Sequence, residues 1–272
     1  MSEEGAQVGA ADLGLKLDYM RLTVDTARGV AQLVLDRPEK MNAITIPMRD
    51  QFADVFRVLE EDGRARLVIV RGAGEEAFTA GGEVGMFMET GPVKLSHLHE
   101  NVAAPERFPG PVIAAVDGYC FGVGLEIALA CDFRIATTRA LFALPEIRLG
   151  MIPGSGGTQR VARLVGMTRA KDMILRSRRI PAEEAHSWGL VTQVVELDQL
   201  DAAADSLANE LLAQPRLALE TAKRVLNMSQ DAPLSTGLQL EGYAYGMLRG
   251  TRDFAEGVRA FVEKRKPRFE GR

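Results

Sequence analysis

Residues 112–130 read VIAAVDGYCFGVGLEIALA and decide the fold class. The apolar run Val112–Val116 predicts a buried strand, and the glycines from Gly118 to Gly124 predict a turn. The segment Leu125–Ala130 is apolar and predicts a buried helix. A strand that passes through a tight turn directly into a helix indicates an α/β protein.

The chain before this stretch has a similar alternation of strands and a helix. Two apolar runs, Met20–Val24 and Val30–Leu35, flank a link that contains glycine, which predicts a β-hairpin. Pro47 begins a segment with apolar residues at helical spacing, and Gly63 ends it. A further strand is predicted over Leu67–Val70, so that the order is strand, strand, helix, strand.

The mixed pattern continues after this stretch and becomes almost wholly helical only beyond Val195. Short strands are predicted over Phe133–Ala136, Leu141–Ala143 and Val191–Val195, and a helix follows the loop Pro153–Gly157. Residues 198–265 are almost wholly helical in pattern, with breaks at two prolines and a glycine.

These patterns divide the chain into three parts. Residues 1–15 are small and polar and are predicted to be a flexible leader. We expect an α/β core over residues 16–196 and a C-terminal helical region over residues 197–272.

The composition excludes several classes of protein. Of the 272 residues, 46% are hydrophobic and 26% are charged, with a net charge of −4, as in a globular protein. No apolar run approaches the ~18 residues needed to span a bilayer, and the N-terminus resembles no secretory or mitochondrial signal. The acidic balance argues against nucleic-acid binding, which depends on neutralising phosphates. We therefore expect a cytoplasmic protein without a membrane or nucleic-acid partner.

The cysteines and histidines give little support for a metal site. Cys120 and Cys131 lie in apolar segments, so we expect two buried free thiols. The histidines are His97, His99 and His186, and none stands in an H-E-x-x-H motif. His97 and His99 could chelate a metal in principle, but surface positions on a helix are the favoured interpretation. No metal site is predicted.

The glycine-rich turns do not match the motifs of nucleotide-binding or serine-dependent enzymes. Gly118, Gly122 and Gly124 are spaced as G-x-x-x-G-x-G, whereas a dinucleotide site needs G-x-G-x-x-G. The Gly154–Gly157 loop lacks the lysine of a P-loop, and Ser155 does not stand in a G-x-S-x-G motif.

Three segments combine such turns with acidic residues: FTAGGE at 78–83, GYCFGVGLE at 118–126 and LPE at 144–146. Small residues beside a strand end let backbone N–H groups approach a ligand, and two such sources would form an anion hole. Glu126 and Glu146 both have apolar neighbours. Burial would raise their pKa values toward those needed for acid/base catalysis near neutral pH.

A simpler interpretation also fits each feature taken alone. A glycine-rich turn is usually only a turn, and a glutamate in an apolar segment is often paired with an arginine. Arg134 and Arg148 are candidates for such pairs. From the residues alone, both the catalytic and the structural interpretation stay open.

Taken together, these segments and RPEKMNA at 37–43 resemble the crotonase (enoyl-CoA hydratase/isomerase) superfamily. The resemblance continues through residues 152–160, 185–191 and 256–261 and covers about residues 20–270 in the family's order. It implies a spiral of ββα units and a C-terminal helical region that packs trimers, often paired into hexamers. It also implies an acyl-CoA thioester substrate and no cofactor beyond the coenzyme A of that substrate.

The resemblance places the substrate contacts on four residues. It implies that the backbone N–H groups of Gly82 and Val123 form an oxyanion hole, and that Ala43 and Ala80 also bind the CoA thioester. Three positions depart from the family pattern: Val123 stands where glycine is usual, Gly82 where alanine is common, and Glu83 in place of aspartate. The added bulk of Val123 leaves the acyl-chain preference open.

The segment over residues 85–98 lines the acyl pocket in the family. Here it contains Met86, Phe87, Met88 and Leu95, which suit an apolar chain but equally suit packing.

The resemblance assigns the acid/base chemistry to Glu126 and Glu146. In a hydratase the two hold a water between them: Glu126 activates it for addition at C3, and Glu146 exchanges the proton at C2. The sequence therefore predicts hydration of a 2-enoyl-CoA to the 3-hydroxyacyl-CoA. Alternatives within the family are an enoyl-CoA isomerase, a CoA-thioester hydrolase and a dehydratase. RNA binding, known in some members, and an inert scaffold are the alternatives of other classes.

Overall fold

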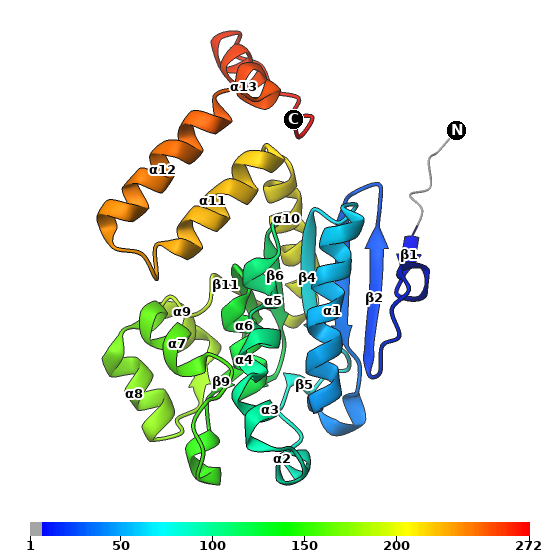
Figure 1. Cartoon of the computed structure of the whole chain (residues 1–272). Coiled ribbons are helices and arrows are strands. Elements are labelled where there is room, and N and C mark those ends of the chain that lie inside the picture. Colours follow the sequence, from blue (N-terminus) through cyan, green and yellow to red (C-terminus); the bar gives the residue numbers. More distant parts are fainter. Residues whose placement is uncertain (1–6) are drawn as a thin grey trace.

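A seven-stranded sheet runs through the structure, a computed structural model that describes residues 7–272 (Figure 1). Its strands lie side by side in the order β1 (Gln7–Gly9), β2 (Met20–Asp25), β3 (Val30–Leu35), β4 (Leu67–Gly72), β6 (Val112–Val116), β8 (Phe133–Thr137) and β11 (Gln193–Val195). The pairs β1–β2 and β2–β3 are antiparallel, and every pair from β3 to β11 is parallel. The predicted hairpin is confirmed, and parallel pairs require crossover connections, which helices supply here.

Both faces of the parallel strands are buried. In β4, Val68 and Val70 belong to the main apolar core beside α1 (Ile46–Asp62) and α6 (Val123–Ala130). Leu67 and Ile69 point to the other face, into a smaller core against α10 (Leu200–Leu212). Strand residues alternate between faces, so a strand covered on both sides is apolar without interruption.

The helix α1 begins and ends where its sequence predicts. The Thr45 hydroxyl accepts a hydrogen bond from the Met48 N–H over 3.2 Å and so caps the N-terminus. Gly63 ends the helix with a φ of 75°, a left-handed conformation that glycine adopts without strain. One face packs into the main core through Phe52, Val55, Phe56 and Leu59.

A second, four-stranded sheet carries the glycine-rich turns. Its order is β10 (Ile180–Pro181), β9 (Leu141–Ala143), β7 (Tyr119–Phe121) and β5 (Ala77–Thr79). The strands β5, β7 and β9 are parallel. We expected a turn over residues 118–124, and this is wrong for Tyr119–Phe121, which forms the strand β7. Tyr119–Phe121 lies between the glycines of a segment typical of a turn, and partners about 20 and 40 residues away stabilise it as a strand.

The remaining helices pack around these sheets. They are α2 (Gly85–Glu89), α3 (Pro92–Ser96), α4 (Leu98–Val102), α5 (Ala104–Arg107), α7 (Gly157–Val165), α8 (Met167–Leu175) and α9 (Ala182–Ser187), with short 3₁₀ turns at Ala11–Leu13, Pro38–Lys40, Glu146–Leu149 and Leu197–Gln199. The helices α4 and α5 bridge α1 and α6, and α7 packs on α6. This group of helices holds α6 in place from two sides.

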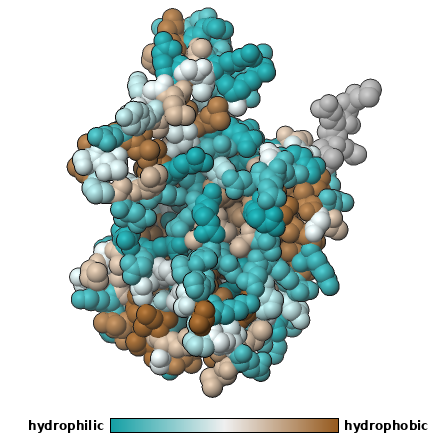
Figure 2. Space-filling view, viewed as in Figure 1, coloured by the Kyte–Doolittle hydropathy of each residue, from teal (hydrophilic) through white to brown (hydrophobic). Residues whose placement is uncertain are grey.

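The chain ends in an arm of three helices, α11 (Arg216–Met228), α12 (Leu234–Leu248) and α13 (Arg252–Val262). Figure 1 shows α12 and α13 extending away from the sheet. Large apolar side chains of the arm are exposed, and brown hydrophobic residues are visible on it in Figure 2. The most exposed are Leu234, Tyr243, Tyr245, Met247, Phe261 and Val262. No helix within residues 7–272 is long and apolar enough to cross a bilayer.

Part of the expected leader belongs to the fold. Residues 1–6 lie outside the described residues, but Gln7–Gly9 pairs with the edge of β2, where we expected a flexible segment. Val8, Leu13 and Leu15 also pack against the main core. Backbone pairing and these few apolar contacts order a segment whose composition alone suggests flexibility.

Candidate active site

A cavity of about 140 Å³ lies where the parallel strands β5, β7 and β9 end. Residues that follow these strands line it, together with the start of α6, one residue of α1 and the loop before α7. The lining comprises Arg49, Ala80, Gly81, Gly82, Val84, Phe87, Leu95, Leu98, Gly122, Val123, Glu126, Pro145, Glu146, Leu149, Met151, Ile152, Gly154 and Ser155. The carboxyl ends of parallel strands are the usual place for a ligand site in α/β proteins.

The cavity brings together five of the six residues that the sequence singled out. Ala80, Gly82, Val123, Glu126 and Glu146 all line it, although they come from segments up to 66 positions apart. Ala43 does not line it.

Ala43 lies in the turn just before Ile44, and its N–H donates to the Lys40 carbonyl over 3.0 Å. Ile44 in turn pairs with the segment around Gly82 through a parallel bridge. The structure therefore places Ala43 behind one wall of the cavity.

The two proposed oxyanion donors have N–H groups free for a ligand. Ile44 bonds to Gly81 and Glu83 on either side of Gly82, and the Gly82 N–H itself donates to no acceptor within residues 7–272. Val123 is the first residue of α6, where an N–H has no partner inside the helix. Both groups are thus available to an oxygen in the cavity.

Gly122 joins β7 to α6 in a conformation that only glycine adopts easily, with φ 53° and ψ −126°. A Cβ at this position would lie 3.0 Å from Glu146 Oε1. The glycine is needed for the turn and also leaves room for the Glu146 carboxyl, which a Cβ would crowd.

Glu126 is held rigidly in the cavity wall. The residue is 2% exposed, and its Oε1 accepts hydrogen bonds from the N–H groups of Ser155 (2.7 Å) and Gly157 (2.9 Å). Gly157 begins α7, so the carboxylate also caps a helix N-terminus, where negative charge is stabilised. These contacts fix the orientation of the carboxylate.

Glu146 has the opposite environment. Its Oε2 is buried and has no hydrogen-bond partner within the described residues. Burial raises the pKa of Glu146 from 4.5 to about 7, and the charge of Glu126 adds to this effect. A backbone hydrogen bond and Arg49 act against the rise in pKa. A carboxyl group with this pKa can both give and take a proton near neutral pH.

The alternative of structural ion pairs is wrong for both arginines that we considered. Arg134 donates to the backbone carbonyls of Leu190, Ala128 and Cys131. Arg148 donates to the Ser177 carbonyl. Each arginine satisfies backbone groups, and neither bonds to a glutamate of the cavity.

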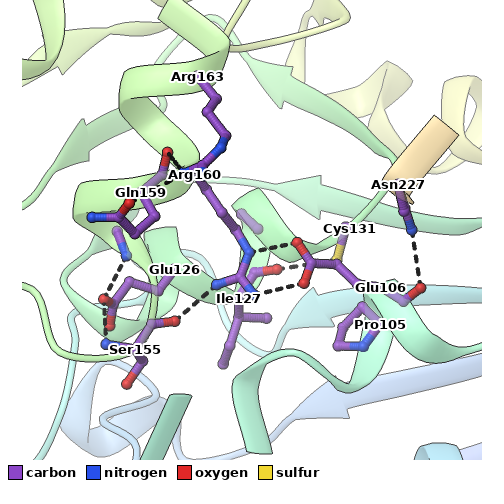
Figure 3. A network of polar contacts seen from close by, with 12 residues as sticks. Pro105, Glu106, Glu126, Ile127, Cys131, Ser155, Gln159, Arg160, Arg163 and Asn227 are labelled. Atoms are coloured by element: carbon purple, nitrogen blue, oxygen red, sulfur yellow. Dashed lines mark hydrogen bonds and ion pairs between the residues drawn. The ribbon is translucent and has the colours of Figure 1, made fainter. Parts of the chain in front are cut away.

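A polar network behind Glu126 fixes the loop that holds it (Figure 3). Arg160 donates through Nη1 to the Ser155 carbonyl over 2.9 Å and forms two bonds of 2.6 Å with Glu106. Asn227 of α11 donates to the Glu106 carbonyl over 3.1 Å. The position of Glu126 therefore depends on contacts that reach from α7 through α5 to the C-terminal arm.

Sequence reasoning missed Arg49 and Ser155. Arg49 lies on α1 at helical spacing from Phe52 and Phe56, so it shares their buried face, and this periodicity was the available signal. Ser155 lies in the loop before α7, whose sequence matches neither a P-loop nor a G-x-S-x-G motif and so carries no signal of its own. In the expected acyl-pocket segment, Phe87 lines the cavity, whereas Met88 is 92% exposed.

The cysteines and histidines lie away from this cavity. Cys120 and Cys131 are free and buried, as expected. His97 bonds to Glu100, and His99 to a backbone carbonyl of its own turn. Within residues 7–272, no group of three or more His, Cys, Asp or Glu side chains is arranged to hold a metal ion.

The sequence and the fold both match known proteins. The sequence model of the enoyl-CoA hydratase/isomerase family matches residues 25–272. The chain is 38% identical to a short-chain-enoyl-CoA hydratase of Clostridium acetobutylicum, covering 87% of this chain and 92% of that protein. It is 34% identical to a crotonyl-CoA hydratase of Syntrophomonas wolfei, covering 92% and 98%.

A crystal structure of an enoyl-CoA hydratase from Bacillus anthracis superposes with a TM-score of 0.84 at 37% identity, covering 90% of this chain and 96% of that one. The mixed α/β fold with its C-terminal helices is thus the fold of these enzymes. The chain belongs to the enoyl-CoA hydratase/isomerase family, the crotonase superfamily that its sequence resembles.

Proposed function

We propose that this protein hydrates 2-enoyl-CoA thioesters to 3-hydroxyacyl-CoA in the cavity at the ends of β5, β7 and β9. One observation carries the proposal: Glu126 and Glu146 line the same cavity as the Gly82 and Val123 N–H groups. The names of the Clostridium and Syntrophomonas relatives, both hydratases, support this choice among the reactions of the family.

In the proposed reaction the thioester carbonyl oxygen accepts hydrogen bonds from the Gly82 and Val123 N–H groups. Glu126 takes a proton from water while the water oxygen bonds to C3, and the C2–C3 π electrons move into the thioester as an enolate. Glu146 then donates its proton to C2. Exchange with solvent restores both carboxyl groups, and no electron acceptor is needed because hydration leaves the redox state unchanged.

The division of roles follows from the two environments. Glu126 is fixed as an oriented acceptor by two backbone N–H groups, which suits the activation of water. Glu146 keeps an unpartnered oxygen and a pKa of about 7, which suits reversible proton transfer. The enolate requires the backbone donors as well, because loss of one such donor costs about 3–4 kcal/mol in comparable enzymes.

The test is the loss of enoyl-thioester absorbance when purified protein is added to crotonyl-CoA. We expect turnover by the unmodified protein and a loss of at least about 100-fold in kcat for Glu146→Gln and for Glu126→Gln. Glu60→Gln is a matched control, since Glu60 is exposed on α1. Full activity of Glu146→Gln would overturn the assignment.

Isomerisation of the double bond is the second candidate, because Glu146 alone has the pKa and the free oxygen that a proton shuttle needs. The variant Glu126→Gln separates the two reactions. Loss of hydration with retained conversion of 3-enoyl-CoA to 2-enoyl-CoA would favour the isomerase.

We extend the proposal to assembly and location. The exposed apolar side chains of α12 and α13 support association of the arm with other copies as a homotrimer, or as a hexamer of two trimers. Light scattering should give three or six times the 29.6 kDa of one chain. The free buried cysteines are in keeping with the reducing cytoplasm.

A further inference from the structure

Arg49 is a buried cation that the proposed hydration does not use. It lies near the N-terminus of α1 and is only 5% exposed. Its Nη1 donates to Ser155 Oγ over 2.9 Å, while its Nε has no partner within residues 7–272. A positive charge near a helix N-terminus is unfavourable, so neither the helix nor the burial explains why a cation stands here.

The two glutamates of the cavity do not satisfy this cation. Glu126 and Glu146 act on Arg49 only through their charge, without a hydrogen bond. Oε1 of Glu126 already accepts two backbone N–H groups, and Oε2 of Glu146 is itself unpartnered within the described chain. Nε of Arg49 and Oε2 of Glu146 are both enclosed, whereas Nη2 of Arg49 points toward Gly82 and donates to no acceptor within residues 7–272. Nη2 is therefore the donor that Arg49 offers to the cavity.

The guanidinium lies beside the place proposed for the thioester. A Cβ built on Gly82 would be 3.1 Å from Arg49 Nη2 and 2.7 Å from the Phe87 ring. The Arg49 guanidinium carbon lies 5.8 Å from the centre of that ring. Arg49 is the one basic residue in the described lining of the cavity, which also includes the apolar Leu95 and Leu98.

A buried guanidinium with an unpartnered Nη2 beside an aromatic ring can bind an oxyanion, and carboxylates match its planar fork. The CoA phosphates are poor candidates, because Arg49 is buried in the wall of a small cavity. We infer that Arg49 binds a carboxylate on the acyl group, so that the preferred substrate is the CoA monothioester of a short unsaturated dicarboxylic acid. This inference rests on the proposed function for the acyl-CoA thioester and adds its substrate class.

The test compares two substrates of the same shape. Glutaconyl-CoA carries a carboxylate at C5, and 5-methyl-2-hexenoyl-CoA carries an isopropyl group there instead. We expect the unmodified enzyme to favour glutaconyl-CoA in kcat/KM, and Arg49→Met to reduce this preference by about 100-fold. The matched control Arg57→Met removes an exposed arginine of the same helix and should keep the preference.

Binding of the saturated analogues separates this inference from the reaction itself. Glutaryl-CoA and 5-methylhexanoyl-CoA differ in the same way and need no turnover, so calorimetry tests the carboxylate site even if hydration is not observed. The inference is supported if the unmodified protein binds glutaryl-CoA more tightly than 5-methylhexanoyl-CoA and if Arg49→Met abolishes this difference. Equal affinity of the unmodified protein for both analogues, or equal losses for both in Arg49→Met, would overturn it.

Discussion

Replacing Glu146 by glutamine should stabilise the fold at alkaline pH and change it little at acidic pH. Burial raises the pKa of Glu146 from 4.5 to about 7, so the folded protein keeps a proton that the unfolded chain has already released. Glutamine has nearly the same shape and never ionises. The variant therefore removes the need to bury a charge, although it removes a catalytic group at the same time.

The size of the effect follows from the pKa difference. Between pH 4.5 and about 7 the folded state binds one more proton at Glu146 than the unfolded state. The free energy of unfolding of the unmodified protein therefore falls as the pH rises through this range. At about 1.4 kcal/mol per pH unit, the loss is at most about 3 kcal/mol and is complete above pH 7. Partial exposure of the side chain reduces this figure through solvent screening.

Urea unfolding at pH 5 and pH 8, at one fixed protein concentration, measures the effect. The free energy of unfolding of Glu146→Gln should be higher than that of the unmodified protein by less than about 1 kcal/mol at pH 5 and by up to about 3 kcal/mol at pH 8. The control Glu60→Gln, on the exposed face of α1, should show the same difference at both pH values. If the difference in unfolding free energy between Glu146→Gln and the unmodified protein is equal at both pH values, or larger at pH 5, the proposed burial of a protonated Glu146 is refuted.

Two further predictions concern the supports of the catalytic groups. Gly122→Ala should lower the free energy of unfolding by about 1–3 kcal/mol, because alanine would have to adopt a positive φ. It should also lower kcat more than tenfold, because the new Cβ would lie 3.0 Å from Glu146 Oε1. The control is Gly85→Ala, because a Cβ at Gly85 has open space. If both variants have the same unfolding free energy in urea and the same kcat, the expectation is contradicted. Arg160→Met should lower kcat about tenfold with little change in KM, because it frees the Ser155 carbonyl and loosens the loop that orients Glu126. A steady-state assay that shows a raised KM with unchanged kcat would contradict this role.

The elements that the sequence predicted best are those with strong local signals. The hairpin of β2 and β3, the helix α1, the strand β6 and the helices of the C-terminal region all lie close to their predicted positions. Each is marked by apolar periodicity and by a capping residue or a break such as Gly63. The strands β1, β5, β7 and β10 were missed, because two or three residues hold little periodicity. The strand β9 is equally short, and it was predicted from its apolar run LFA.

Local sequence signals were also insufficient to decide the roles of the site residues. Glu126 and Glu146 were named from their motifs, yet the residues alone could not decide between catalysis and an ion pair with Arg134 or Arg148. The structure excludes those two pairs, since both arginines bond to backbone carbonyls. The catalytic roles themselves stay predictions until the variants are measured.

The amino-acid sequence was enough to predict the α/β class, the family and the two candidate acids, because periodicity and motifs are properties of neighbouring residues. That Arg49 and Ser155 share one cavity with these acids became apparent from the three-dimensional arrangement, as did the burial of Glu146 and the hold of α7 on Glu126. The physical reason is that burial and charge depend on which distant segments meet. The donor and the acceptor in the bond between Arg49 and Ser155 are 106 positions apart in the chain.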